Sequence, residues 1–138
     1  MLRKIMVISF LLAIFSCHPA RGTFVISQIK QSDHTIIGAI EVNHLPKKQS
    51  CEQAVKSRII DKFLNEGFEN TSYWRPRTFN SVKLTPEIRT RLYENVYVTE
   101  DGITKKGSVK KCYCKFQFNL NSSLQILENE GIMHAFGY

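Results

Sequence analysis

The stretch that says most about the fold is KCYCKFQFNL, residues 111–120. Its side chains alternate strictly, as they do along a β-strand that buries one face and exposes the other. One face of this strand carries Cys112, Cys114, Phe116, Phe118 and Leu120, and the other carries Tyr113, Lys115, Gln117 and Asn119. The pattern predicts a half-buried strand whose two cysteines both point toward the core.

The spacing of the cysteines restricts their pairing. Residues two apart on an extended strand lie roughly 7 Å apart, at or beyond the reach of a relaxed disulfide, so Cys112 and Cys114 should not bridge each other. We therefore expect Cys51 to bridge to one of them, and the pattern leaves open which. The bridge would close a loop of about 60 residues and contribute roughly 4 kcal/mol to stability in the chain-entropy model. One thiol is left over.

Cys51 also begins the clearest helical pattern in the chain. Ser50 followed three residues later by Gln53 is a capping box, which marks the start of a helix. An apolar stripe with a spacing of four follows, formed by Val55, Ile59 and Phe63. The pattern predicts an amphipathic helix from about Cys51 to Glu66, with Gly67 as its left-handed C-terminal cap.

The remaining elements are shorter. Residues 24–29 and 35–42 read as a hairpin around a turn at 31–33, with a bulge at Gly38. Pro86 begins a short helix that should end near Asn95. Strands are expected at 78–84 and 96–99. Asp101-Gly102 should form a two-residue hairpin turn, after which a strand returns from Ile103, with a second turn at Lys106-Gly107 into the cysteine strand. A last hairpin is expected from 124–127 and 132–138. The sequence thus predicts one small α+β domain, residues 23–138, with an antiparallel sheet of five or six strands, one main helix, one short helix and one disulfide.

The first 22 residues are typical of a secretory signal peptide. A basic start, residues 1–4, precedes an apolar run, residues 5–15, which falls short of the about 20 residues that span a bilayer. Small residues before Thr23 favour cleavage there. Alternatively, residues 14–17 resemble a bacterial lipobox, which implies a lipid on Cys17; Phe15 departs from the small or β-branched residue of that pattern. The expected location is periplasmic or extracellular, with an outer-membrane lipoprotein as the alternative.

Export changes the charge of the protein. The full chain has 19 basic and 12 acidic residues, a net charge of +7. Removing residues 1–22 takes away Arg3, Lys4 and Arg21 and leaves a net charge of +4. A modestly basic protein is weak evidence for an anionic partner, so an anionic envelope component remains a candidate and nucleic acid is not expected.

Two clusters are candidates for partner contacts. Aromatic rings and guanidinium groups lie together in Tyr73, Trp74, Arg75 and Arg77, residue types that anchor protein interfaces; the alternative is that Trp74 packs in the core. A basic patch is formed by Lys105, Lys106, Lys110 and Lys111, which would contact anions or, alternatively, protect exposed strands from edge-to-edge pairing.

No enzymatic motif is present, since the chain lacks G-x-S-x-G, H-E-x-x-H and a phosphate-binding glycine loop. No cofactor is expected, and no metal either, because zinc sites favour longer spacers than Cys-x-Cys.

We therefore expect a small, non-enzymatic, exported protein that binds another exported protein or an envelope component. The layout resembles that of small periplasmic immunity proteins of the colicin M type, in which a disulfide also joins the start of a helix to a sheet strand. This resemblance implies an inhibitor role. A lipoprotein that serves an envelope machine is another candidate, and a thiol-active secreted enzyme using Cys51 or the spare cysteine is the last.

Overall fold

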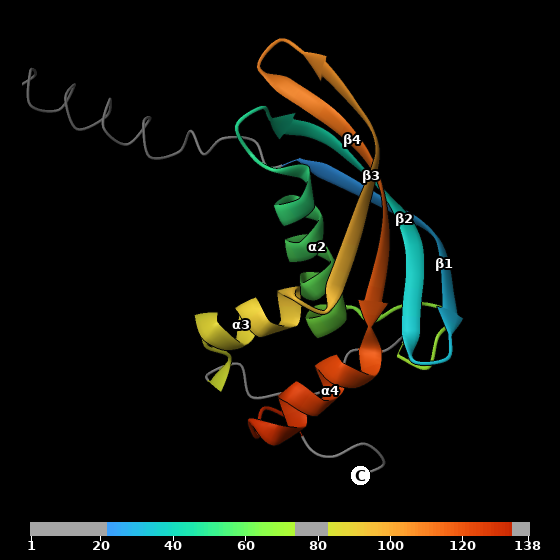
Figure 1. Ribbon diagram of the computed structural model, residues 1–138, viewed down its shortest axis with the longest axis vertical. Coiled ribbons are helices and arrows are strands. Elements are labelled where there is room, and N and C mark those ends of the chain that lie inside the picture. The colour runs from blue at the N-terminus through green and yellow to red at the C-terminus, as the bar shows by residue number, and fades with distance from the viewer. Residues whose placement is uncertain (1–21, 74–82, 134–138) are drawn as a thin grey trace, which may run out of the picture.

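The computed structural model describes residues 22–73 and 83–133 (Figure 1). Four strands and three helices lie in these ranges, so the predicted α+β class is confirmed, with fewer strands than the five or six expected. In chain order they are β1 (Thr23–Ser32), β2 (Thr35–Pro46), α2 (Cys51–Asn65), α3 (Pro86–Tyr93), β3 (Val96–Lys106), β4 (Val109–Asn119) and α4 (Leu120–Asn129).

The strands form one antiparallel sheet in the order β1-β2-β4-β3. β4 is central and carries the alternation read from the sequence: Phe116 and Phe118 are buried, whereas Tyr113 is exposed. The buried side faces the helices, which all lie on the same side of the sheet (Figure 1). The ring centroids of Phe63 in α2 and Phe118 are 4.9 Å apart, which places the core between this helix and the sheet.

α2 begins and ends close to the residues that the sequence predicts. The Ser50 hydroxyl accepts a hydrogen bond from the Gln53 backbone N–H at 3.4 Å, and Gly67 has the positive φ of +75° that a left-handed cap requires. The predicted bridge from Cys51 is confirmed, and its partner is Cys112. Cys114 keeps a free, buried thiol.

The prediction of a turn at Asp101-Gly102 is wrong. β3 continues through this dipeptide to Lys106, with Asp101 as the extra residue of a β-bulge between Glu100 and Gly102. The chain reverses at the second expected turn, at Gly107, whose φ is +63°. A bulge absorbs Asp-Gly without ending the ladder, and the longer hairpin pairs more backbone groups. Two expected strands therefore merge into one.

The prediction of a final hairpin is also wrong, because residues 120–129 form α4. The Asn119 side chain caps this helix by accepting a hydrogen bond from the Ser122 N–H at 3.0 Å. Leu120, Leu124 and Leu127 are buried at spacings of four and three, the helical period. Residues 134–138, the rest of the expected hairpin, lie outside the described residues.

Two smaller expectations also change. The bulge expected at Gly38 lies in the facing strand, where Gln28 and Ile29 of β1 are both opposite Gly38, while Gly38 itself stays paired with Phe116. The strand expected at 78–84 falls mostly on residues outside the described ranges, and Lys83 and Leu84 are not in a strand.

Candidate interaction surface

The face of the sheet that is turned away from the three helices carries large exposed side chains. Val25 on β1 is 54% exposed, Tyr97 on β3 is 67% exposed and Tyr113 on β4 is 42% exposed. All three alternate with inward-facing core residues on their strands. We call this surface, with its neighbouring charged residues Glu41, Asp101, Lys111 and Lys115, the helix-free face.

Strand register sets the centre of the helix-free face. Val25 pairs with Glu41, Glu41 with Tyr113, and Tyr113 with Gly102, which gives one row across all four strands. Gly102 leaves the ring of Tyr113 uncovered on that side, since even a Cβ built at Gly102 would be 3.8 Å from Cδ2 of the ring. The bulge at Asp101 places the glycine in this register, so a local irregularity leaves one side of the aromatic ring open.

Charged residues surround the tyrosine ring. The Lys111 ammonium lies 2.8 Å from Oε1 of Glu41 and 5.2 Å from the ring centroid of Tyr113. The hydrogen bond from Lys111 lowers the pKa of Glu41, and the bond to Glu41 raises the pKa of Lys111, so both groups are charged at neutral pH. Lys115 lies 3.7 Å from Asp101. Because both signs alternate here, the helix-free face is not a purely cationic surface.

The aromatic and arginine cluster predicted from the sequence is only partly described. Tyr73 is 3% exposed, and its ring centroid is 4.9 Å from that of Phe63, so its side chain belongs to the core. Its backbone N–H donates to the Thr71 hydroxyl at 3.1 Å. Trp74, Arg75 and Arg77 lie outside the described residues, and their role in partner contact stays a prediction.

The predicted basic patch is divided and enlarged by the fold. Lys111 faces Glu41 on the helix-free face, whereas Lys105, Lys106 and Lys110 lie at the end of the β3–β4 hairpin. This end is fixed to the connector between β2 and α2, where the Lys47 N–H donates to the Ser108 carbonyl at 3.2 Å and the Lys110 ammonium to the Lys47 carbonyl at 3.2 Å. Lys47 and Lys48 therefore join the patch. We call the combined group the lysine tip: Lys47, Lys48, Lys105, Lys106 and Lys110.

Lys47 and Lys48 could not be assigned to this patch from the sequence, because they lie about sixty residues before the hairpin in an ordinary connector. The one signal in the sequence that could have placed Lys47 and Lys48 near the hairpin is the expected disulfide. A bridge from Cys51 to Cys112 brings the residues just before Cys51 near those just before Cys112.

The free thiol of Cys114 is poorly suited to chemistry. It is 3% exposed, and burial raises its pKa to about 11, with further contributions from the carboxylates of Glu100 and Asp101. At neutral pH the group is a protonated thiol, which is a weak nucleophile. Within the described ranges no group of three or more His, Cys, Asp or Glu residues is placed to hold a metal ion.

A hollow of about 340 Å³ opens between the β1–β2 turn and α4. The side chain of Gln31 borders it and holds the Ser72 backbone N–H at 2.7 Å and the Ser72 hydroxyl at 3.0 Å. Among its described lining residues, His34 and Glu128 are the titratable ones. Apolar surface makes up the larger part of its lining, with polar side chains at its border.

The Cys51–Cys112 disulfide indicates a compartment outside the cytoplasm, because cytosolic thiols are kept reduced. Within the described part of the chain, no helix combines the length and apolarity needed to cross a bilayer. The chain matches no protein-family model, no curated protein sequence and no solved structure.

Proposed function

We propose that this protein is a small, exported, non-enzymatic binding protein that contacts another exported protein through the helix-free face of its sheet. The observation that carries the proposal is the exposure of Tyr97 and Tyr113, together with Val25, on a sheet face that no described helix covers. Tyrosine is enriched where proteins bind proteins, because it offers a large apolar ring and a polar hydroxyl group with few rotatable bonds.

The charges around Tyr113 favour a protein partner over a polyanion. Lys111 is paired with Glu41, and Lys115 lies near Asp101, so the surface carries both signs around an aromatic centre. Protein interfaces have this arrangement, with aromatic residues at the centre and polar residues at the rim. A surface that bound a polyanion would instead carry unpaired cations.

A thiol-active enzyme receives less support from the same residues. Cys51 and Cys112 are joined in the disulfide, and Cys114 is buried with a raised pKa. A lipoprotein anchored at Cys17 and an immunity-type inhibitor would both still act by surface contact, so they are forms of this proposal rather than rivals to it.

The test is site-specific photo-crosslinking in the native host. A photoreactive phenylalanine analogue replaces Tyr97 in one variant and Tyr113 in a second, and a third variant carries it at Glu87, an exposed residue of α3 away from the helix-free face. We expect one discrete adduct with a second protein from the positions on β3 and β4 and none from the control on α3.

The outcomes distinguish between partners and between surfaces. An adduct of twice the mass of the chain would identify the partner as a second copy. A fourth variant carries the analogue at Trp74. An adduct there, with none at either tyrosine position, would move the contact to the cluster predicted from the sequence. No adduct at any position in a host that expresses the protein would contradict the proposal. Each variant must keep the thermal unfolding temperature of the parent.

A further inference from the structure

The lysine tip concentrates positive charge at one end of the molecule. Its five lysines come from two segments, residues 42–51 and 102–127, and neither segment contains an aspartate or a glutamate. Within the described residues, none of the five ammonium groups takes part in an ion pair; the nearest acidic residue along the chain from Lys48 is Glu52, which lies 2.8 Å from Lys56. The cluster is therefore an uncompensated cationic surface.

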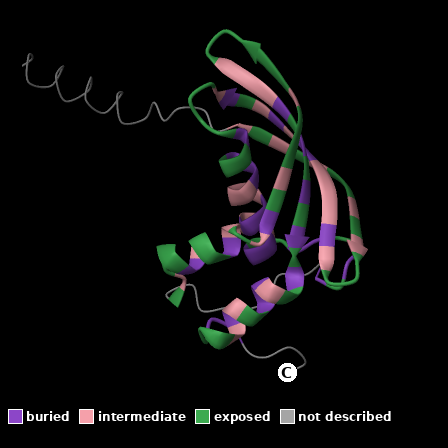
Figure 2. Cartoon of the chain, in the orientation of Figure 1, coloured by how far each residue is buried: buried purple, intermediate pink, exposed green. Residues whose placement is uncertain are grey.

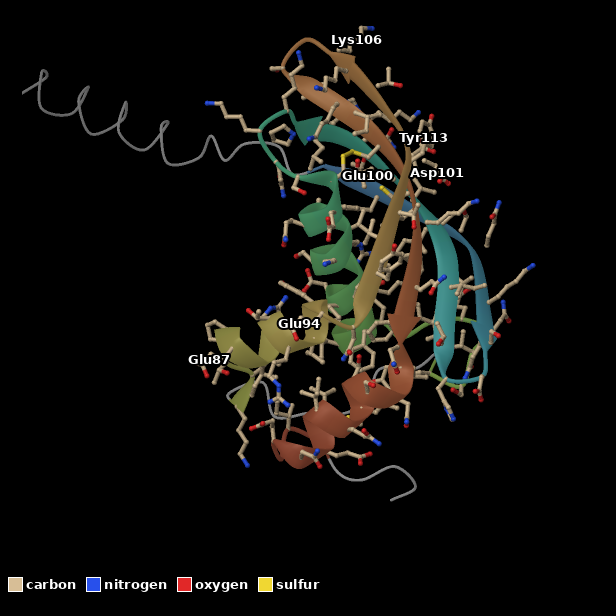
Figure 3. The ribbon with its side chains drawn as sticks, in the orientation of Figure 1. Glu87, Glu94, Glu100, Asp101, Lys106 and Tyr113 are labelled. Carbon is tan, nitrogen blue, oxygen red and sulfur yellow. A yellow bond between two sulfur atoms is a disulfide. The ribbon has the colours of Figure 1, made fainter. Side chains whose placement is uncertain are left out.

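The opposite end carries charges of both signs. Figure 3 shows Lys106 at the end of the β3–β4 hairpin and Glu87 on α3 at the far end of the molecule. Three more carboxylates lie at this end, those of Glu94, Glu128 and Glu130. They are nearly balanced by three cations, those of Lys83, Arg89 and Arg91. Unpaired positive charge is thus concentrated at the lysine tip, and the field of an anionic surface would orient the molecule with this tip inward.

The chain enters the fold beside the lysine tip. Thr23 pairs with Asn43 at the start of β1, and Leu45, two residues further along β2, pairs with Lys110 of the tip. A Cβ built at Gly22 would lie 2.9 Å from the Asn43 carbonyl oxygen and 3.6 Å from Cδ1 of Leu45. Cys17 precedes Gly22 by five residues, a reach of at most about 17 Å. Any lipid carried there would hold this same end against a membrane.

We propose that the lysine tip is a contact site for the headgroups of anionic lipids, by which the protein sits on a membrane surface. This site is separate from the helix-free face, and the contact does not require a lipid on Cys17. Each lysine near an anionic membrane contributes about 1 kcal/mol of attraction, which falls as salt screens it.

The composition of the tip favours a lipid surface over nucleic acid. All five cations are lysines, which act as compact point charges, whereas the planar guanidinium of arginine is preferred where phosphates are bound in pairs of hydrogen bonds. The tip is a projecting hairpin end, exposed or half-buried over its length (Figure 2), rather than a groove lined by aromatic rings on which bases stack. A projecting end suits a flat surface.

The experiment measures binding to vesicles for protein purified from cells that express the full 138-residue chain. One set of vesicles is pure phosphatidylcholine and the other contains about one third phosphatidylglycerol as the anionic lipid. The test variant is Lys48→Gln, Lys105→Gln, Lys106→Gln. The control variant is Lys30→Gln, Lys83→Gln, Lys115→Gln, which removes the same charge from other surfaces. We expect the test variant to lose about 100-fold in affinity for anionic vesicles and the control less than about 3-fold.

A second measurement reports orientation and does not depend on how strongly the N-terminal segment binds lipid. A fluorophore is attached to Ser108→Cys at the tip or to Glu87→Cys on α3, and the vesicles carry a quencher on their headgroups. We expect the probe at 108 to be quenched and the probe at 87 not to be quenched. The quenching at 108 should be lost in the test variant, and it should disappear when the ionic strength rises to about 0.5 M.

Several results would overturn the proposal. Equal losses in the test and control variants would mean that net charge alone drives binding. Equal quenching at both probe positions would remove the preferred orientation, and equal affinity for both kinds of vesicle would remove the preference for anionic lipid. Tighter binding to a short DNA duplex than to anionic vesicles at the same salt would assign the tip to nucleic acid instead.

Discussion

Phe116 on β4 packs directly against the backbone of Gly38 on β2. A Cβ built at Gly38 would lie 2.8 Å from both Cε1 and Cζ of the Phe116 ring and 3.2 Å from the Ser27 carbonyl oxygen. Phe116 is 1% exposed, so its ring is enclosed and cannot move aside without disturbing its neighbours. The glycine is therefore a packing requirement of the central strand pair, and its lack of a side chain gives the ring its place.

Gly38→Ala should lower the free energy of unfolding by about 1–3 kcal/mol, the range for overpacking a tight interior site. The matched control is Gly102→Ala, where the added Cβ meets only Tyr113 at 3.8 Å, an ordinary contact. Urea denaturation of both variants measures the difference. Equal losses in the two variants would contradict the packing argument and point to a general cost of alanine in these strands.

Cys51→Ala should cost about 4 kcal/mol in the chain-entropy model, because the Cys51–Cys112 bridge joins residues 61 apart and restricts the unfolded chain. Cys51 is the residue to change, since replacing Cys112 would leave Cys51 free to bridge to Cys114. Urea denaturation with and without a reductant provides the check. Reduction should destabilise the wild type by the same amount and leave the Cys51→Ala variant unchanged; a loss in both would mean that the reductant acts elsewhere.

The thiol of Cys114 should make stability fall at alkaline pH. Burial raises its pKa from 9.0 to about 11, so the folded protein holds this proton more tightly than the unfolded chain. The resulting stabilisation is fully present below pH 9 and is lost as pH rises toward 11, because the unfolded chain ionises first. The stability difference between wild type and Cys114→Ala, followed by thermal unfolding at several pH values, should shift against the wild type over this interval. A constant difference would show that the thiol titrates alike in both states.

Asn119→Ala should destabilise the protein by about 1 kcal/mol, since it removes the side chain that accepts from the Ser122 N–H at the start of α4. Asn121→Ala is the control, because Asn121 is exposed within the first turn and does not cap the helix. Urea denaturation of the two variants measures the effect. A loss as large for Asn121 as for Asn119 would mean that the capping bond contributes little.

The parts of the fold that could be predicted are those with a strong local signal. Alternation in residues 111–120 predicted β4 and the face of each of its side chains, and the capping box at Ser50 with the apolar stripe predicted α2. α4 was not predicted, because Leu124, Ile126 and Leu127 in a short segment fit a strand as well as a helix. The packing of Leu120, Leu124 and Leu127 into one core decides between them.

The candidate surfaces could be predicted only in part. Alternation placed Tyr113 on the outward face, but nothing in the sequence indicated that the helices would all cover the other side and leave Tyr97 and Val25 open. Three of the five residues of the lysine tip, Lys105, Lys106 and Lys110, could be recognised in the sequence as a run of lysines near the cysteine strand. Lys47 and Lys48 join them only in the folded protein, where the Lys47 backbone N–H donates to the Ser108 carbonyl.

By itself, the sequence determined the class of fold, the main helix, the central strand and the need for a bridge from Cys51 to that strand. These follow from periodicity, capping and the distance between alternate residues of a strand, which are local properties of the chain. The tertiary structure decided that the bridge joins Cys112 rather than Cys114, that Asp101-Gly102 forms a bulge and not a turn, and that five lysines meet at one end. These depend on register between segments distant in the chain, which is set by the packing of the whole sheet against α2 and not by any stretch alone.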